Sequence, residues 1–159
     1  MPLRVSVMGA VVGLLGSLIV AAPANAAVSY TGNLRNWTHD NCLDSDNGGN
    51  AYALPCNGGN YQNWQIQFYA SIDGFDTYRV VNQQTHRCLD GNDNSVYTNP
   101  CQDPNYWQKW RVLSSYNGST QYFAFQSVQT GRCVVGFGTS LSPQQCHNYV
   151  SSESWRPGS

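Results

Sequence analysis

Six cysteines and three histidines are the residues of this chain whose side chains could bind a metal or form covalent bonds. The cysteines are even in number: Cys42, Cys56, Cys88, Cys101, Cys133 and Cys146. In a secreted chain an even set indicates a disulfide framework, although six cysteines allow fifteen pairings. His39, His86 and His147 lie near cysteines, but the spacing is wrong for paired zinc ligands and oxidised cysteines do not bind metal. We therefore expect disulfides, no metal and no cofactor.

The carboxylates show no pattern that indicates catalysis. A glycosidase needs two carboxylates that face each other across the scissile bond, one of them with a raised pKa. The single glutamate, Glu153, stands where the other repeats have glutamine, and Asp73 and Asp76 lie in a glycine-containing turn. No Gly-x-Ser-x-Gly motif is present in the sequence. We expect a binding protein and not an enzyme.

The first 26 residues have the features of a signal peptide. Arg4 carries a positive charge, an apolar run extends from Val5 to Ala22, and Ala24-Asn25-Ala26 is a small-x-small cleavage site. We expect a secreted, extracellular protein whose residues 27–159 form one domain. The formal net charge is −1 and no basic stripe is present, so we expect no nucleic-acid partner and, after cleavage, no membrane partner.

Three features recur with a period of about 45 residues, which is the most specific signal in the sequence. The first cysteines of successive units are 46 and 45 residues apart, the second cysteines are 45 and 45 apart, and Trp64, Trp110 and Trp155 are 46 and 45 apart. Short alternating segments between Gly, Asn, Asp and Pro predict strands and hairpins, and no segment has helical periodicity. The sequence therefore predicts an all-β chain of three repeats, approximately 30–72, 73–117 and 118–159.

Each repeat contains one pair of cysteines at the same offset. Pairing within repeats is therefore the economical solution, and we expect three disulfides: Cys42–Cys56, Cys88–Cys101 and Cys133–Cys146.

Two short sequences in each repeat resemble the bacterial secreted type of the ricin B-chain lectin family. They are Cys-Leu-Asp and Gln-x-Trp, with altered forms in the third repeat: Cys42-Leu43-Asp44 with Gln62-Asn63-Trp64, Cys88-Leu89-Asp90 with Gln108-Lys109-Trp110, and Cys133-Val134-Val135 with Glu153-Ser154-Trp155. The resemblance covers the chain from about Tyr30 to Trp155. It implies a β-trefoil, in which a six-stranded barrel is capped by three hairpins and one tryptophan per repeat fills a shared core.

The same resemblance implies carbohydrate sites in the first two repeats. A sugar offers hydroxyl groups, which a carboxylate or amide binds, and a face of C–H groups, which stacks on an aromatic ring. In ricin-type lectins these roles belong to the aspartate of Cys-Leu-Asp and to an aromatic residue before the second cysteine, with help from polar residues near the Gln of Gln-x-Trp. The residues carried over are Asp44, Tyr52, Asn60 and Gln62 in the first repeat and Asp90, Tyr97, Asn105 and Gln108 in the second.

The aspartate and the tyrosine are present together in two repeats and absent together in the third, which has Val135 and a serine instead. A pair that the fold requires is expected in every unit, whereas a pair needed only for binding can be lost as a pair. This comparison favours the binding role over turn capping for Asp44 and Asp90. The two cysteines of each repeat, 14, 13 and 13 residues apart, are closer together than is usual in the family, so the rim of each site is predicted to be short.

The predicted function is carbohydrate binding, to a polysaccharide or to glycans, through shallow sites in repeats one and two. The alternative is a secreted β-trefoil scaffold for protein interaction or protease inhibition, with decayed sugar sites. An inhibitor needs a long accessible loop with a cleavable residue. Residues 114–120 form the most exposed candidate loop, but they do not have these features. The aspartates and tyrosines retained in two repeats therefore favour the lectin over the inhibitor.

Overall fold

The computed structural model describes residues 28–147 and 151–158, and the signal peptide predicted at residues 1–26 lies outside them. Within the described residues the chain forms twelve strands and three short 3-10 helices. In chain order these are β1 (Val28–Asn36), β2 (Asn41–Ser45), β3 (Ala51–Pro55), η1 (Asn60–Gln62), β4 (Asn63–Ile72), β5 (Phe75–Asn82), β6 (Arg87–Gly91), β7 (Val96–Pro100), η2 (Tyr106–Gln108), β8 (Trp110–Asn117), β9 (Thr120–Ser127), β10 (Arg132–Phe137), β11 (Ser140–Gln145), η3 (Ser151–Glu153) and β12 (Trp155–Pro157). The predicted all-β class is confirmed.

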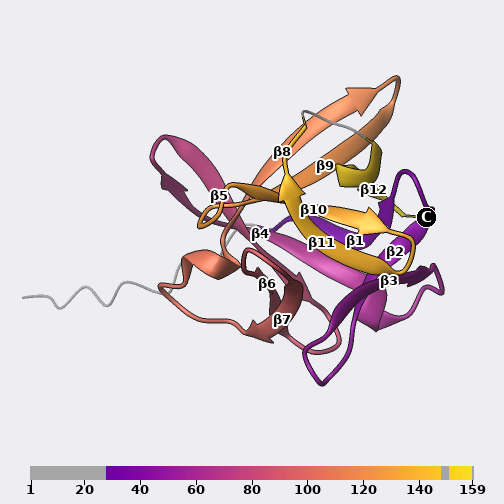
Figure 1. Cartoon of the computed structure of the whole chain (residues 1–159), viewed down its shortest axis with the longest axis horizontal. Coiled ribbons are helices and arrows are strands. Elements are labelled where there is room, and N and C mark those ends of the chain that lie inside the picture. Colours follow the sequence, from indigo (N-terminus) through magenta and orange to yellow (C-terminus); the bar gives the residue numbers. More distant parts are fainter. Residues whose placement is uncertain (1–27, 148–150, 159) are drawn as a thin grey trace, which may run out of the picture.

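Six strands form a closed antiparallel ring. Around the ring β1 pairs with β4, β4 with β5, β5 with β8, β8 with β9, β9 with β12, and β12 again with β1. The other six strands form the hairpins β2–β3, β6–β7 and β10–β11, which attach to β1, β5 and β9 respectively. Strands β3, β7 and β11 contact one another, so the three hairpins lie together as a cap (Figure 1).

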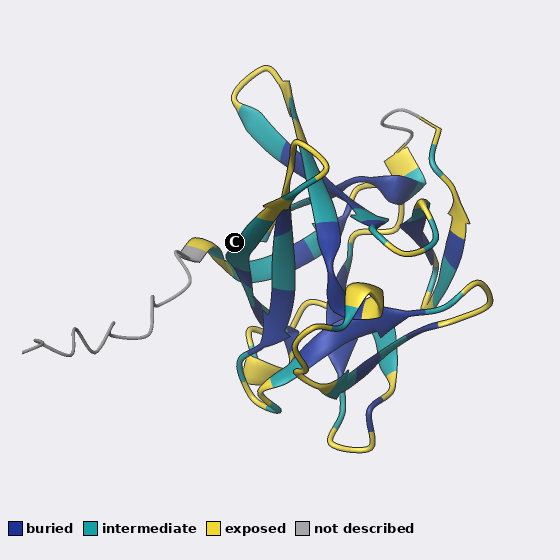
Figure 2. Cartoon of the chain, turned by 90° about the vertical axis from the view of Figure 1, so that its left-hand side faces the viewer, coloured by how far each residue is buried: buried dark blue, intermediate teal, exposed yellow. Residues whose placement is uncertain are grey.

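Two long hairpins of the ring project from the body of the molecule. The strands β4 and β5 are joined by Asp73 and Gly74, with φ values of 52° and 79°. Two central residues with positive φ are what a type I′ turn requires, which explains the Asp-Gly sequence at this place. The hairpin of β8 and β9 turns at Gly118, where φ is 59°, and its tip is exposed. Figure 2 shows the exposed residues gathered at such tips and the buried ones along the middle of the strands.

The three repeat tryptophans lie in the core, as predicted. Trp64 and Trp155 have no exposed surface and Trp110 has 2%. Each indole Nε1–H donates to the backbone carbonyl of the residue that follows the first cysteine of its repeat, at 2.8 Å to Leu43, 3.0 Å to Leu89 and 3.2 Å to Val134. A buried indole needs such a partner, so each tryptophan fixes its hairpin to the core.

The three disulfides join the predicted partners within each repeat: Cys42–Cys56, Cys88–Cys101 and Cys133–Cys146. Each closes a loop of 13 or 14 residues that contains a whole cap hairpin. On the chain-entropy account a loop of this length stabilises the folded state by about 3 kcal/mol. None of the helices formed by residues 28–147 and 151–158 has the length and apolar character to cross a bilayer.

Candidate functional site

A hollow of about 200 Å³ opens beside the cap hairpin of the first repeat. Asp44 on β2 and Tyr52 on β3 are direct cross-strand partners, which puts both side chains on one face of the hairpin. The lining is made of residues from this hairpin and from the segment that leads into η1: Asp44, Ser45, Asp46, Tyr52, Asn57, Gly59 and Tyr61. The structure therefore brings together the predicted aspartate and tyrosine of this repeat.

Gln62 holds the carboxylate of Asp44 in place from behind. Its amide Nε2 donates to Asp44 Oδ2 at 2.9 Å and to the carbonyl of Pro55 at 3.1 Å, and its Oε1 accepts from the backbone N–H of Asn57 at 2.8 Å. Gln62 has no exposed surface, so in this conformation it positions Asp44 and does not itself face solvent. Burial raises the pKa of Asp44, and the hydrogen bond from Gln62 opposes this shift.

The second repeat has the same arrangement. Asp90 is the cross-strand partner of Tyr97. Gln108 Nε2 donates to Asp90 Oδ2 at 3.1 Å and to the carbonyl of Pro100 at 3.0 Å. Gln108 is also fully buried. Burial, and after it the negative charge of Asp90, raises the pKa of the Tyr97 hydroxyl. The two hairpins therefore share one arrangement, in which the aspartate faces the tyrosine and accepts a hydrogen bond from the glutamine.

The carboxylate of Asp90 differs from that of Asp44 in its neighbours. Asn99 Nδ2 donates to Asp90 Oδ2 at 3.1 Å, whereas the first repeat has the exposed Leu54 at this place. The other oxygen, Oδ1 of Asp90, is buried, and no described residue donates to it in good hydrogen-bond geometry. The Tyr97 hydroxyl interacts with the same carboxylate, and this hydrogen bond contributes to the raised pKa of Tyr97.

The third repeat keeps a side chain that anchors the turn after the second cysteine, but it lacks the aspartate and the facing tyrosine. Glu153 is 1% exposed, and its Oε1 accepts from the backbone N–H of His147 at 2.7 Å and lies 3.0 Å from His147 Nδ1. It thus replaces the glutamine in tying down the turn after the second cysteine. On the hairpin itself Val135 faces Ser142, so neither the carboxylate nor the aromatic ring is present.

The two asparagines predicted for these sites occupy unequal positions. Asn105 precedes η2, where its side chain accepts from the backbone N–H of Trp107 at 3.1 Å and donates to Gln102 Oε1 at 3.3 Å. Asn60 is the first residue of η1 and is exposed, and it is not part of the lining. Counting back from the glutamine, Gly59 and not Asn60 is the counterpart of Asn105.

Sequence reasoning missed a second aromatic residue in the first site, and the second repeat has an aromatic residue at the equivalent sequence position. Tyr61 lines the hollow, is 37% exposed and accepts from Asn47 Nδ2 at 3.0 Å. Trp107, also 37% exposed, is its counterpart in the second repeat, while the third has Ser152. The signal was present, because the residue directly before the Gln of Gln-x-Trp is aromatic in the same two repeats that keep the aspartate and the tyrosine.

Asp46 also lines the first hollow and was not predicted. Both of its oxygens accept from Asn50, Oδ1 from the backbone N–H at 3.0 Å and Oδ2 from the side-chain amide at 2.7 Å. These hydrogen bonds, led by the one from the Asn50 side chain, lower the pKa of Asp46. Asp46 therefore closes the turn between β2 and β3 and keeps a negative charge at the edge of the hollow.

Chemically, each site offers what a hydroxyl-rich ligand requires. A fixed carboxylate accepts hydrogen bonds, and two partly exposed aromatic rings supply apolar surface. Across residues 28–147 and 151–158 no group of three or more His, Cys, Asp or Glu side chains is arranged to hold a metal ion.

A protein-family model described as the cytolethal distending toxin A/C domain matches residues 69–151, which are 83 of the 159 residues. The matched segment begins near the end of β4 and includes the whole of the second repeat's site.

Known structures share the fold at low sequence identity. A structure of cytolethal distending toxin from Actinobacillus actinomycetemcomitans matches with a TM-score of 0.67 and 19% identity, over 80% of this chain and 89% of that one. The designed threefold-symmetric protein ThreeFoil matches with a TM-score of 0.64 and 19% identity, over 79% and 96%. SeviL bound to asialo-GM1 saccharide matches with a TM-score of 0.62 and 12% identity, over 79% and 93%.

Proposed function

The chain belongs to the cytolethal distending toxin A/C domain family, and we propose that it is a secreted β-trefoil protein that binds carbohydrate without transforming it. The closed six-stranded ring, the three cap hairpins and the threefold recurrence of cysteine and tryptophan support the trefoil. So does the similarity to the threefold-symmetric ThreeFoil. Three disulfides favour an oxidising, extracellular location.

One observation carries the carbohydrate proposal. The same constellation of a glutamine-held aspartate, a facing tyrosine and a second aromatic residue occurs in two repeats, and the aspartate and both aromatic residues are absent from the third. Burial of Asp44 and Asp90, 4% and 2% exposed, costs free energy that the fold does not require, because the third repeat does without it. A binding function accounts for this cost.

The ligand class follows from the composition of the sites. The carboxylates accept hydrogen bonds from sugar hydroxyls, and the hydroxyl groups of Tyr52 and Tyr97 can donate or accept them. The aromatic rings cover the C–H face of a pyranose. SeviL, which has a similar fold, is bound to a saccharide. The ricin B-chain resemblance of the Cys-Leu-Asp and Gln-x-Trp sequences points to the same class.

Two sites on one rigid body favour an extended ligand. A single shallow sugar site binds weakly, but two sites that engage the same polymer or surface raise the overall affinity without new contacts. We therefore propose that the natural ligand is a polysaccharide or a surface that displays many glycans, in preference to a free monosaccharide.

The test is glycan-array binding and insoluble-polysaccharide pull-down by residues 27–159, compared with the double variant Asp44→Asn/Asp90→Asn. Asparagine keeps the shape and can still accept from the glutamine, so the fold is expected to remain. Asp76→Asn, in the exposed part of the β4–β5 hairpin and outside the lining of the first site, is the control. Binding that only the double variant loses supports the proposal. Absence of binding to every glycan and polysaccharide by the unaltered chain contradicts it, and binding that the double variant retains in full refutes the assigned sites.

A further inference from the structure

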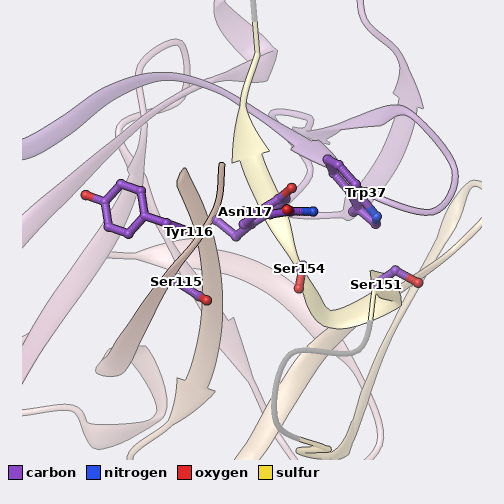
Figure 3. A pocket seen from close by; sticks show the side chains of 7 residues that line it. Trp37, Ser115, Tyr116, Asn117, Ser151 and Ser154 are labelled. Atoms are coloured by element: carbon purple, nitrogen blue, oxygen red, sulfur yellow. The ribbon is translucent and has the colours of Figure 1, made fainter. Parts of the chain in front are cut away.

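A separate hollow of about 160 Å³ is lined by residues of all three repeats (Figure 3). Its walls come from three segments that are far apart in the sequence: the turn after β1, the β8–β9 hairpin and η3 with the residue that follows it. The lining residues are Trp37, Ser115, Tyr116, Asn117, Tyr122, Ser151 and Ser154. None of them belongs to the two aspartate sites.

Trp37 is the notable residue of this hollow, because the fold does not need a tryptophan there. Its backbone N–H donates to the carbonyl of Ser154 at 2.9 Å. In the other repeats the equivalent hydrogen bonds come from Gln83 and Val128. A glutamine and a valine serve the backbone equally well, and yet Trp37 leaves 38% of its surface exposed. Exposed aromatic residues that the fold does not require favour a role in binding.

The indole of Trp37 is held in one orientation by two neighbours. The Tyr122 ring meets it edge to face, with centroids 4.8 Å apart and an interplanar angle of 82°. The guanidinium of Arg156 lies 5.1 Å from the indole centroid and also pairs with Asp40. A side chain that is already ordered loses little conformational entropy when a ligand binds, which favours binding.

The rest of the lining is polar and uncharged. Ser115, Asn117 and Ser151 supply hydroxyl and amide groups, while the ring of Tyr116 points away from Trp37 (Figure 3). Tyr122 is 7% exposed, and no described residue gives its buried hydroxyl a hydrogen-bond partner. A concave site with an aromatic wall and a few convergent polar groups is typical of small-ligand binding.

We propose that this hollow is a third saccharide site, built differently from the other two, which binds one neutral sugar residue against Trp37. The lining has no carboxylate, so hydrogen bonds to sugar hydroxyls come from neutral serine and asparagine groups. A protein partner is a poorer match, since seven residues line the hollow whereas a stable protein interface takes roughly 20–30 residues on each side. The site shares a ligand class with the aspartate sites, but it uses none of their residues.

The test uses the indole N–H signals in ¹H–¹⁵N NMR spectra of residues 27–159, because two exposed tryptophans report on different sites. Trp37 reports on this hollow and Trp107 on the second repeat, and Trp37→Phe and Trp107→Phe assign the two signals. The probes are galactose, N-acetylglucosamine, cellobiose and the asialo-GM1 oligosaccharide. With at least one of them we expect a saturable shift of the Trp37 signal that persists in Asp44→Asn/Asp90→Asn.

A second variant tests the hollow itself. Asn117→Ala, at an exposed position of the β8–β9 hairpin, is expected to weaken the Trp37 response at least fivefold and to leave the Trp107 response unchanged. If no probe moves the Trp37 signal while Trp107 responds, the third site is refuted and the second-repeat site stands. If Trp37 responds and Trp107 does not, the third site stands and the second-repeat site fails. If neither responds, both fail.

Discussion

The cap hairpin of the third repeat differs from the other two in a way that separates folding from binding. All three hairpins have the disulfide, the buried tryptophan and a polar side chain that anchors the turn after the second cysteine. Only the first two have the aspartate and the facing tyrosine. The features present three times therefore belong to the fold, and those present twice belong to the site.

The anchoring residue changes together with the aspartate. In the first two repeats a neutral glutamine donates to the carboxylate, whereas in the third the anchor is Glu153 and the aspartate position is Val135. A glutamate anchor would place a second carboxylate against Asp44 or Asp90. Glu153 is compatible with the fold because the third repeat has no aspartate at this position.

The largest effect is expected from a matched pair of tryptophans in the second repeat. Trp110 is 2% exposed and donates to Leu89, so Trp110→Phe leaves a cavity and an unpaired carbonyl, and should lower the free energy of unfolding by about 3 kcal/mol. Trp107 is 37% exposed, so Trp107→Phe should change it by less than about 0.5 kcal/mol. Urea denaturation measures both. Equal losses would contradict the division between fold and site.

A second pair of variants tests the link between anchor and aspartate. Gln62→Glu brings a carboxylate into the place from which Gln62 donates to Asp44 at 2.9 Å, and should destabilise the protein by about 2 kcal/mol at pH 7. Like charges raise the pKa of the pair, so the lost stability should return as the pH falls and one carboxyl group takes up a proton.

The matched change in the third repeat is Glu153→Gln. It keeps an acceptor for the His147 N–H and should cost less than about 1 kcal/mol at pH 7. Thermal unfolding at pH 7 and pH 4.5 compares the two variants. If Gln62→Glu is as mild as Glu153→Gln at pH 7, the proposed incompatibility is wrong.

The pH dependence of the first site follows from the pKa of Asp44, which burial raises. Because the folded-state pKa is higher than the unfolded one, the folded state binds the proton more tightly, and the contribution of Asp44 to stability decreases as the pH rises through this range. Sugar binding should instead strengthen as the pH rises through this range, because the deprotonated carboxylate is the group that accepts hydrogen bonds from the sugar. In Asp90→Asn, glycan binding should weaken with acidification at a higher pH than that of an ordinary aspartate, and ¹³C NMR of the Asp44 carboxyl group gives the pKa directly. A value at or below 3.8 would contradict this.

The smallest effect is expected from restoring the lost site. Val135→Asp with Ser142→Tyr and Glu153→Gln rebuilds the aspartate, the facing tyrosine and the glutamine anchor. The variant should gain a few-fold in apparent affinity for a multivalent glycan surface and nothing for a monosaccharide at the two original sites. Surface plasmon resonance on an immobilised glycan measures the gain, with Glu153→Gln alone as the control. No gain would show that more than these three residues is missing.

The sequence by itself determined the repeat organisation of this protein. The period of about 45 residues placed the cysteines and tryptophans at equivalent positions in three units, and equivalent positions in a repeated fold meet around a common axis. The disulfide pairing could be predicted for this reason, whereas the core role of Trp64, Trp110 and Trp155 and the placing of Asp44 and Tyr52 in one site were implied by the family resemblance. Periodicity is a property of the chain and needs no knowledge of long-range contacts.

Only the tertiary structure decided what each polar residue does. Gln62 and Gln108 were expected beside the ligand, and the structure buries both behind the aspartates, because the turn after the second cysteine folds back over the hairpin. The hollow at Trp37 joins segments around residues 37, 115–122 and 151–154, whose proximity comes from closure of the barrel between β1, β9 and β12. No repeat contains that site alone, so no comparison among the repeats could have found it.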